Sequence, residues 1–383
     1  MQRRPKFVVI SSEIRRDLAA PFRLMERFDL YHLYNRNTWH DMRLQDYEPH
    51  DFRFRTPWGL YRLLRNLKPD VVQGPEPFSL LMLPFLLAVY LYLVRYPAVK
   101  GVSVTLEPLS VQTKYGRVLA LIFRKVLMGW FKRVSLVFWY VPGTYEQLRA
   151  HGASDAQLVN ALYGCWGVEE MFSPEGPRFS YPSRPVVLYV GRLVKEKGLF
   201  VLIEAFQQLH HRGIRAHLAF VGDGRDREQL QRQVTAFGLN NSVRFYGSVK
   251  NVDLPQYVRA ADVFVLPSLS TRLWVEQVGT SGWQALASGV PTVVSDTQQL
   301  REFFPATCSI GVAPGDAQAL ASALEDLLVN QEKRRRMGEA ALTFARERLN
   351  VQKNVLRAEE FILSCGDASV GLFSYSGSLN SST

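Results

Sequence analysis

The chain has 383 residues, of which 47% are hydrophobic and 21% are charged, proportions typical of a globular protein with room for two domains. Its cysteines, Cys165, Cys308 and Cys365, lack the spacing of a metal site or a disulfide framework, which excludes a cysteine-stapled secreted module and fits a reducing cytoplasm. The net charge is +11, and residues 1–180 hold 24 Lys and Arg against 16 Asp and Glu. This excess indicates an anionic partner such as a membrane surface, an acidic acceptor or nucleic acid. Nucleic acid ranks last of the three because no nucleic-acid-binding motif is visible.

Short apolar segments alternate with helical patterns along the first half of the chain. No secretory signal pattern is expected at the start, because the apolar run after the basic residues is only as long as a strand. The alternation predicts a parallel sheet covered by helices on both faces. The predicted strands are 7–10, 70–72, 101–106, 136–141 and 158–163, and the clearest helices are 58–67 and 145–151.

Residues 79–94 are almost continuously apolar. At about 16 residues the stretch is shorter than the ~20 that a membrane-spanning helix requires, and Pro84 interrupts it. A buried helix plus a strand is therefore favoured over membrane insertion.

Residues 112–134 combine a helical pattern with a strong positive charge. The stretch has no acidic residue, and most of its cations fall near one helical face, opposite an apolar face. It is either a core helix with a solvated basic face or a helix that lies on an anionic bilayer, and the missing counter-charge slightly favours the bilayer. The cations are Lys114, Arg117, Arg124, Lys125, Lys132 and Arg133.

The second half begins after residues 174–185, whose Pro, Gly and Ser predict an interdomain linker. Residues 186–198, VVLYVGRLVKEKG, predict a buried strand, a turn at Gly191 and a helix over 199–209. Ligands bind at the carboxyl ends of strands in open parallel sheets, where a helix N-terminus offers free N–H groups. Arg192 and Lys197 at that position predict a site for a doubly charged anion such as a diphosphate. On these residues alone, a turn with solvated charges is an equal alternative.

Five further fragments follow in order: FVGDG (220–224), VRFYGSV (243–249), ADVFVLPS (261–268), EQVG (276–279) and ALASGVPTVVSD (285–296). Together with GRLVKEKG, they resemble the donor-binding domain of glycosyltransferase family 4, a retaining group with the GT-B fold. The resemblance is strong over about 184–345 and weak over the N-terminal half.

This resemblance implies an α/β chain of two Rossmann-like domains whose parallel sheets face across a cleft. Residues 1–175 are expected to bind the acceptor, and residues 176–345 are expected to bind a nucleotide-sugar donor. A helix over 346–363 is expected to pack back on the first domain, and 364–383 are expected to form a disordered tail.

The resemblance also implies roles for single residues. The family uses the arginine and lysine that match Arg192 and Lys197 to neutralise the leaving diphosphate, without a divalent metal, and no metal site is expected here. Glu276 matches the first of two glutamates separated by seven residues, which contacts the transferred sugar. The second, which holds the ribose hydroxyls, is here Gln284. Its amide accepts a hydrogen bond but lacks the charge, which implies weaker or altered ribose binding.

Backbone groups and turns complete the expected donor site. A helix start after EQVG would bind the distal phosphate and sugar hydroxyls through N–H groups. The GDG turn and the end of VRFYGSV are expected near the nucleotide. The expected contact positions are Gly191, Gly222, Gly224, Ser248, Val249, Val278, Gly279 and Thr280.

The first domain departs from the family pattern. Residues 11–17, SSEIRRD, lack the Gly-rich loop of many members, and Leu106 stands at or near the place of a histidine that many members carry. Glu107 is therefore the best candidate for acceptor binding. His32, His40 and His50 show no catalytic spacing and are predicted to lie at the surface.

These residues predict a retaining hexosyltransferase that moves a sugar from a nucleotide sugar to a glycan or lipid-linked acceptor, in cell-surface polysaccharide or glycolipid synthesis. UDP is the default nucleotide and GDP the next. The nucleotide sugar is a substrate, and no cofactor is expected. The expected location is the cytoplasm, with peripheral contact to the inner face of an anionic membrane through 112–134.

Two alternatives stay open. The first is a degenerate GT-B protein that binds a nucleotide sugar without turnover, which Gln284 and Leu106 suggest. The second is a nucleotide-sugar epimerase, which the histidine-poor first domain disfavours.

Overall fold

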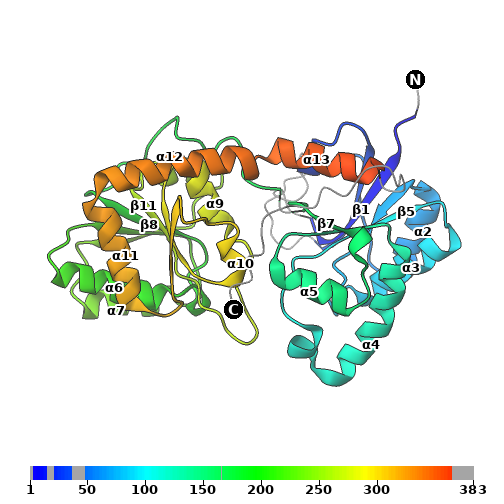
Figure 1. Cartoon of the computed structure of the whole chain (residues 1–383), viewed down its shortest axis with the longest axis horizontal. Helices are drawn as coiled ribbons and strands as arrows, with labels where there is room; N and C mark the ends of the chain where they lie inside the picture. The colour runs from blue at the N-terminus through cyan, green and yellow to red at the C-terminus, as the bar shows by residue number, and fades with distance from the viewer. Residues whose placement is uncertain (1–2, 15–20, 37–47, 165, 365–383) are drawn as a thin grey trace. The chain divides into compact units, whose positions relative to one another are not determined.

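A computed structural model describes residues 3–14, 21–36, 48–164 and 166–364. The chain forms two compact units, one of Met1–Trp166 with Val351–Thr383 and the other of Gly167–Asn350. Each unit has a parallel β-sheet packed against helices, as the alternation of strands and helices predicted (Figure 1). The expected tail lies, apart from Ser364, outside the described residues.

The first unit contains a seven-stranded sheet in the order β3-β2-β1-β4-β5-β6-β7, with parallel neighbours throughout. Successive side chains of a strand point to opposite faces, so β1 contributes to two cores. Val8 and Ile10 pack with residues of α2, α3 and α4, whereas Phe7 and Val9 pack with α13. The strands are β1 Lys6–Glu13, β2 Asp29–Arg36, β3 Asp51–Arg53, β4 Val71–Gln73, β5 Lys100–Val104, β6 Leu136–Trp139 and β7 Leu158–Asn160. The helices are α2 Pro57–Leu67, α3 Leu83–Arg95, α4 Val111–Arg133, α5 Pro142–Ala150 and α13 Val351–Ser364.

Strand β2 was not expected from the sequence, and it overturns one prediction. His32 on β2 is only 4% exposed, and its Nε2 lies 2.7 Å from the Ser11 hydroxyl. Burial, and then the charge of Arg23, lower the pKa of His32 to about 4. The prediction of a surface histidine was wrong because the polar residues of β2 hid its strand pattern. His40 lies outside the described residues.

The prediction for residues 79–94 was partly wrong. The stretch holds one helix, α3, with Pro84 in its first turn and no strand beside it. Proline fits there because N–H groups in the first turn of a helix have no carbonyl partner within the helix, so the missing N–H costs no hydrogen bond. Within the described ranges, no helix is long and apolar enough to cross a membrane.

Helix α4 has the predicted amphipathic character but departs from helical geometry at Gly116, whose φ is +82°. Its inner face buries Phe123, Leu127 and Trp130. Arg133 is held against the protein, because its guanidinium donates hydrogen bonds to the Leu93 carbonyl at 2.9 Å and to carbonyls that follow α3. The outer face is not only basic. It also presents Val118, Leu121 and Ile122, which are 74%, 64% and 51% exposed.

The second unit contains a six-stranded parallel sheet in the order β10-β9-β8-β11-β12-β13. Its main core gathers residues of β8, β9, α6 and α11. The strands are β8 Val186–Val190, β9 His217–Val221, β10 Val243–Gly247, β11 Val263–Leu266, β12 Thr292–Ser295 and β13 Ser309–Val312. The helices are α6 Leu199–His211, α7 Arg227–Ala236, α8 Leu254–Arg259, α9 Thr280–Ala287, α10 Gln298–Arg301, α11 Ala317–Val329 and α12 Gln331–Arg348.

The expected domain boundary at 175 falls inside the second unit. The Arg259 guanidinium donates to the carbonyls of Met171, Ser173 and Pro177 at 2.6, 2.8 and 3.2 Å. These bonds give partners to backbone carbonyls that lie outside any strand or helix. They also fix the segment to the end of α8. The Pro- and Gly-rich composition of 174–185 therefore marks the absence of regular structure, while the chain enters the second unit at Gly167.

The expected final helix is divided in two by the structure. Helix α12 ends at Arg348 in the second unit, and α13 buries Val355, Ala358 and Ile362 in the first. The Glu359 carboxylate of α13 accepts a hydrogen bond from the Arg27 amide at 2.9 Å. The first unit is therefore built from both ends of the chain.

Shortening Ile362 to alanine should destabilise the first unit. Ile362 is 1% exposed in the core that α13 shares with β1, and removing a buried isoleucine side chain costs about 2–5 kcal/mol. We expect this loss in urea unfolding. Leu356→Ala on the outer face of α13, where the side chain is 54% exposed, is the control and should change stability by less than about 0.5 kcal/mol. Equal losses in both variants would contradict the packing of α13.

Candidate functional site

The predicted donor residues follow strands that end at one edge of the second sheet. From β8 the chain builds outward through β9 and β10, and then crosses to β11 on the other side of β8. The gap between β8 and β11 is thus the point where the strand order reverses, and open α/β sheets bind ligands there, at the carboxyl ends of the strands. Arg192 and Lys197 follow β8, and Ser268 and Glu276 follow β11.

An ion pair joins the loops after β8 and β11. The Lys197 ammonium donates to Glu276 Oε2 at 2.5 Å, and the Ser268 hydroxyl donates to the same oxygen at 2.6 Å. The Lys197 and Glu276 side chains are only 14% and 12% exposed. The Lys197 ammonium also lies 5.2 Å from the ring centre of Trp274, within cation–π range. The structure therefore brings together two of the three predicted catalytic residues, although their sequence positions are 79 apart.

The backbone after Lys197 depends on a glycine. Gly198 has φ of +71°, and a Cβ on it would lie 1.8 Å from the Pro267 carbonyl oxygen. The Leu269 amide donates to the Glu196 carbonyl at 2.8 Å. These close contacts hold the two loops against each other, so Lys197 reaches Glu276 from a fixed backbone.

The glycines of the GDG turn have a packing role that the sequence did not reveal. A Cβ on Gly222 would lie 1.9 Å from the Gly191 carbonyl oxygen, and one on Gly224 would lie 2.4 Å from the Leu193 carbonyl oxygen. The loops after β8 and β9 are therefore in direct backbone contact, which no larger residue would allow.

Arg192 is exposed, and its side chain makes no hydrogen bond or ion pair with any described residue. Its carbonyl accepts the Tyr189 hydroxyl at 2.9 Å. Burial, and then the charge of Glu276, raise the pKa of Tyr189 well above its usual value. The phenol therefore stays protonated and fixes the Arg192 backbone.

Helix α9 begins as the sequence predicted, immediately after Gly279, whose φ is +64°. Val278 is buried and Thr280 is exposed at this helix start, and Gln284 is half-buried one turn further along. The Gln284 amide makes no hydrogen bond to the Lys197–Glu276 pair or to any other described residue. Ser248 and Val249 follow β10, at the outer side of the sheet.

The carboxyl edge of the first sheet carries a second group of charged residues. Glu107, the predicted acceptor residue, follows β5 and forms an ion pair with Lys114 of α4. Its other oxygen accepts the Leu109 amide at 3.0 Å. The expectation that 112–134 lacks a counter-charge was therefore wrong for Lys114, because its partner precedes the helix.

Glu76, which sequence reasoning missed, follows the neighbouring strand β4. Its Oε1 accepts the Thr105 hydroxyl at 2.6 Å and the Phe78 amide at 3.1 Å. Burial raises the pKa of Glu76 to about 7; the two hydrogen bonds oppose this shift and the charge of Glu107 adds to it. The signal in the sequence was an acidic residue directly after a short apolar strand, in VVQGPEP.

No set of three or more His, Cys, Asp or Glu side chains is placed to hold a metal ion within the described parts of the chain. The charged groups at the two sheet edges are the residues on which chemistry can be built. In the second unit they suit a phosphate beside a hydroxylated ligand.

Comparisons with known proteins agree with this arrangement. Residues 177–344 match the family model described as Glycosyl transferases group 1. Alpha-D-kanosaminyltransferase from Streptomyces kanamyceticus is 32% identical over 165 residues, which cover 43% of this chain and 42% of that protein. The lipopolysaccharide core biosynthesis glycosyltransferase LpsE from Rhizobium meliloti is 28% identical over 215 residues, which cover 55% of this chain and 59% of that protein. The chain thus spans about half the length of these curated relatives.

The similarity to solved structures extends over both units. The crystal structure of Anabaena Alr3699/HepE in complex with UDP and glucose has a TM-score of 0.73 and 17% sequence identity, covering 94% of this chain and all of that one. The fold is therefore GT-B, with two Rossmann-like units. The match to the glycosyl transferases group 1 model lies within the second unit, which also holds the Lys197–Glu276 pair.

Replacing Glu76 by glutamine should change how stability depends on pH. A carboxyl whose pKa is about 7 in the folded protein, against an ordinary value of 4.5, binds its proton more tightly when folded. The free energy of unfolding therefore falls as pH rises from about 4.5 to about 7, by up to about 3 kcal/mol, and stays reduced above pH 7. Urea unfolding at several pH values should show this decline in the wild type relative to Glu76→Gln. Because His32 contributes equally to both, the difference isolates Glu76, and parallel pH profiles would contradict its raised pKa.

Proposed function

We propose that the chain is a retaining glycosyltransferase that uses a nucleotide sugar, with UDP favoured. The observation that carries this proposal is the Lys197–Glu276 pair between β8 and β11, inside the group 1 domain. The solved structure of HepE with UDP and glucose supports a nucleotide-sugar donor for a chain of this fold. The relatives named for a kanosaminyl transfer and for lipopolysaccharide core synthesis support transfer to a glycan or lipid-linked acceptor.

On the donor side, Arg192 and Lys197 supply positive charge to the leaving diphosphate. The unpaired guanidinium of Arg192 can take two phosphate oxygens as a planar fork. Lys197 is a point charge that Glu276 holds in place until the ligand arrives. Positive charge placed where negative charge grows during bond cleavage stabilises the transition state, so this chemistry proceeds without a metal.

Glu276 has a second task that follows from its hydrogen bonds. Both Lys197 and Ser268 bond to Oε2, so Oε1 is the oxygen that would accept from a hydroxyl of the transferred sugar. The free N–H groups at the start of α9, around Gly279 and Thr280, would bind the distal phosphate. Gln284, on the same helix, would hold the ribose through a neutral amide, more weakly than a carboxylate.

Transfer with retention requires attack from the face that the diphosphate leaves. The sugar C1–oxygen bond to the phosphate breaks, and the acceptor oxygen bonds to C1 on the same face. The acceptor proton passes to the leaving phosphate oxygen, so no dedicated base is needed. Glu107 and Glu76 would orient the acceptor from the edge of the first sheet, since carboxylates accept hydroxyl hydrogen bonds.

We also propose that the outer face of α4 binds the surface of an anionic membrane. Arg117, Arg124 and Lys125 are exposed among the apolar residues Val118, Leu121 and Ile122. Apolar side chains that enter the headgroup region next to cations at the surface give peripheral binding. This face would bring the first unit to a lipid-linked acceptor.

Removing the charge of Lys197 or of Arg192 should strongly slow turnover. We expect wild-type protein to bind a UDP-sugar or a GDP-sugar in calorimetry and to release the nucleoside diphosphate slowly. Lys197→Met, which keeps the length of the side chain, and Arg192→Gln should each lower the release rate by about 10²–10³-fold, as for loss of one donor to a developing anion.

Arg335→Gln is the matched control for this experiment, because Arg335 lies exposed on α12 and pairs only with surface glutamates. It should leave binding and release unchanged. A wild-type protein that binds the donor without releasing nucleotide, even with membrane extracts as a source of acceptor, would favour the degenerate alternative. No binding of any nucleotide sugar would overturn the proposal.

Acidic residues on the outer face of α4 should release the protein from membranes. We expect the wild type to float with vesicles of phosphatidylcholine and phosphatidylglycerol, and Leu121→Glu/Ile122→Glu to bind at least about tenfold more weakly because apolar burial is lost and charge repulsion is gained. Leu356→Glu, at an exposed position of α13, is the control. Flotation that is equal for all three proteins would rule out this surface.

A further inference from the structure

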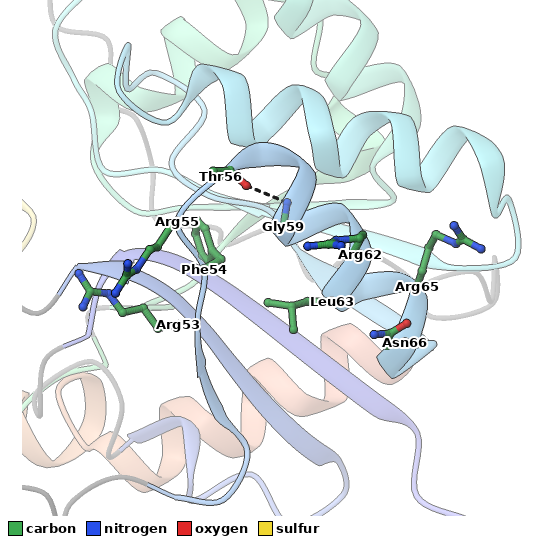
Figure 2. A pocket seen from close by; sticks show the side chains of 9 residues that line it. All are labelled: Arg53, Phe54, Arg55, Thr56, Gly59, Arg62, Leu63, Arg65 and Asn66. Atoms are coloured by element: carbon green, nitrogen blue, oxygen red, sulfur yellow. Dashed lines mark hydrogen bonds between the residues drawn. The ribbon is translucent and has the colours of Figure 1, made fainter.

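The first unit has an open cavity of about 520 Å³ between the end of β3 and one face of α2 (Figure 2). The proposed reaction makes no use of it. Among its lining residues are four arginines and no acidic residue. The arginines are Arg53, Arg55, Arg62 and Arg65.

The sequence places these arginines on two elements. Arg53 ends β3, and Arg55 lies in the segment that leads to Thr56, the residue that caps α2 by accepting the Gly59 amide at 3.0 Å. Arg62 lies three residues after Gly59, which puts both on the same face of α2 (Figure 2). The opposite face of α2 is buried in the core through Leu60 and Leu64. The helix is therefore held by its apolar face, while its other face contributes to the cavity.

Among the described residues, no acidic side chain balances the charges of these arginines. None of the four guanidinium groups forms an ion pair with an acidic residue in the described parts of the chain. Within the described ranges, their guanidinium groups make one hydrogen bond, from Arg53 Nε to the Asn35 carbonyl at 3.2 Å. Arg23 in the same unit shows the usual alternative, because it pairs with Asp51 at 2.8 Å. Four like charges around one cavity repel each other, and a bound anion would relieve that repulsion.

The cavity walls define the kind of anion. A guanidinium group matches phosphate oxygens in a bidentate manner, and several of them suit a group that carries two or more negative charges. Phe54 and Leu63 also line the cavity, so the ligand can place an apolar or sugar-ring part beside its charged group. Parallel strands bring the carboxyl ends of β3, β4 and β5 to one edge of the sheet, so Arg53 and Arg55 lie at the edge that also carries Glu76 and Glu107. Arg65 and Asn66 line the cavity from the last turn of α2.

We propose that this cavity is a binding site for a phosphorylated ligand, a phosphomonoester or diphosphate carried by a sugar or by a lipid. It is separate from the diphosphate site proposed in the second unit, and it does not depend on the proposed transfer reaction. If that reaction takes place, Arg53 and Arg55 would hold the phosphorylated group after the end of β3, in the unit where the acceptor is expected.

The test uses full-length protein with Arg192→Gln and Lys197→Met, which removes the other proposed diphosphate site. Calorimetry with inorganic pyrophosphate at low ionic strength should show binding to this background. Adding Arg55→Gln/Arg62→Gln should weaken the binding at least tenfold. Adding Arg232→Gln/Arg244→Gln instead removes two exposed arginines from the second unit and should leave it within twofold. With Arg62→Lys in place of Arg62→Gln, part of the affinity should return, since lysine keeps the positive charge but not the planar guanidinium that binds two phosphate oxygens.

Circular dichroism and thermal melting would establish that each variant is folded. Absence of pyrophosphate binding in the background protein would overturn the proposal, as would equal binding by the Arg55→Gln/Arg62→Gln variant. Failure of the proposed transferase function would look different, since nucleotide sugars would not bind the wild type while pyrophosphate would still bind the background protein.

Vesicle flotation with phosphatidic acid distinguishes the two sources of phosphate. If Arg55→Gln/Arg62→Gln lowers flotation more than Arg232→Gln/Arg244→Gln does, the cavity takes a lipid headgroup. If flotation is unchanged while pyrophosphate binding is lost, the ligand is a soluble phosphorylated compound. Either result supports the site.

Discussion

The partly buried ion pair between Lys197 and Glu276 is the contact on which the carboxyl edge of the second sheet depends. It joins the loops after β8 and β11, and Ser268 supports it from the end of β11. A buried charge without its partner costs several kcal/mol, so neither residue can be lost without disturbing the other. The backbone of Gly198 also lies in close contact with Pro267, so the two loops that carry the pair are packed directly against each other. A rigid frame suits a site that must place positive charge before its ligand arrives.

The first unit uses its sheet edge in a different way. Glu76 and Glu107 follow neighbouring strands, but their hydrogen bonds and charges differ. Glu107 is neutralised by Lys114, whereas Glu76 relies on the Thr105 hydroxyl and the Phe78 amide. Burial and the nearby charge of Glu107 raise the pKa of Glu76 to about 7, so this carboxyl changes its charge close to neutral pH. The two edges therefore differ in their charged groups, with Arg192 and a Lys197–Glu276 pair on one and the carboxylates of Glu76 and Glu107 on the other.

The excess of positive charge in the first half of the chain has several uses. Arg133 donates hydrogen bonds to carbonyls at and after the end of α3. Arg23 and Lys114 form ion pairs with carboxylates. Other cations of this half lie on the outer face of α4 and around the cavity beside β3. A net charge alone could not separate these uses, because it reports neither pairing nor position.

The sequence by itself determined the α/β class, most strands, the helix start after Gly279 and the place of Arg192, Lys197 and Glu276 in loops that follow strands. These features are local, since an apolar run, a glycine turn and the charges beside it lie within a few residues. Strand β2, the burial of His32 and the role of Glu76 were decided by tertiary structure. A strand with polar residues becomes recognisable only when its neighbours cover it, and the pKa of a carboxyl depends on burial by distant segments. The same reason applies to the Lys197–Glu276 contact and to the arginine cavity, since the folded sheet alone brings separate loops to one edge.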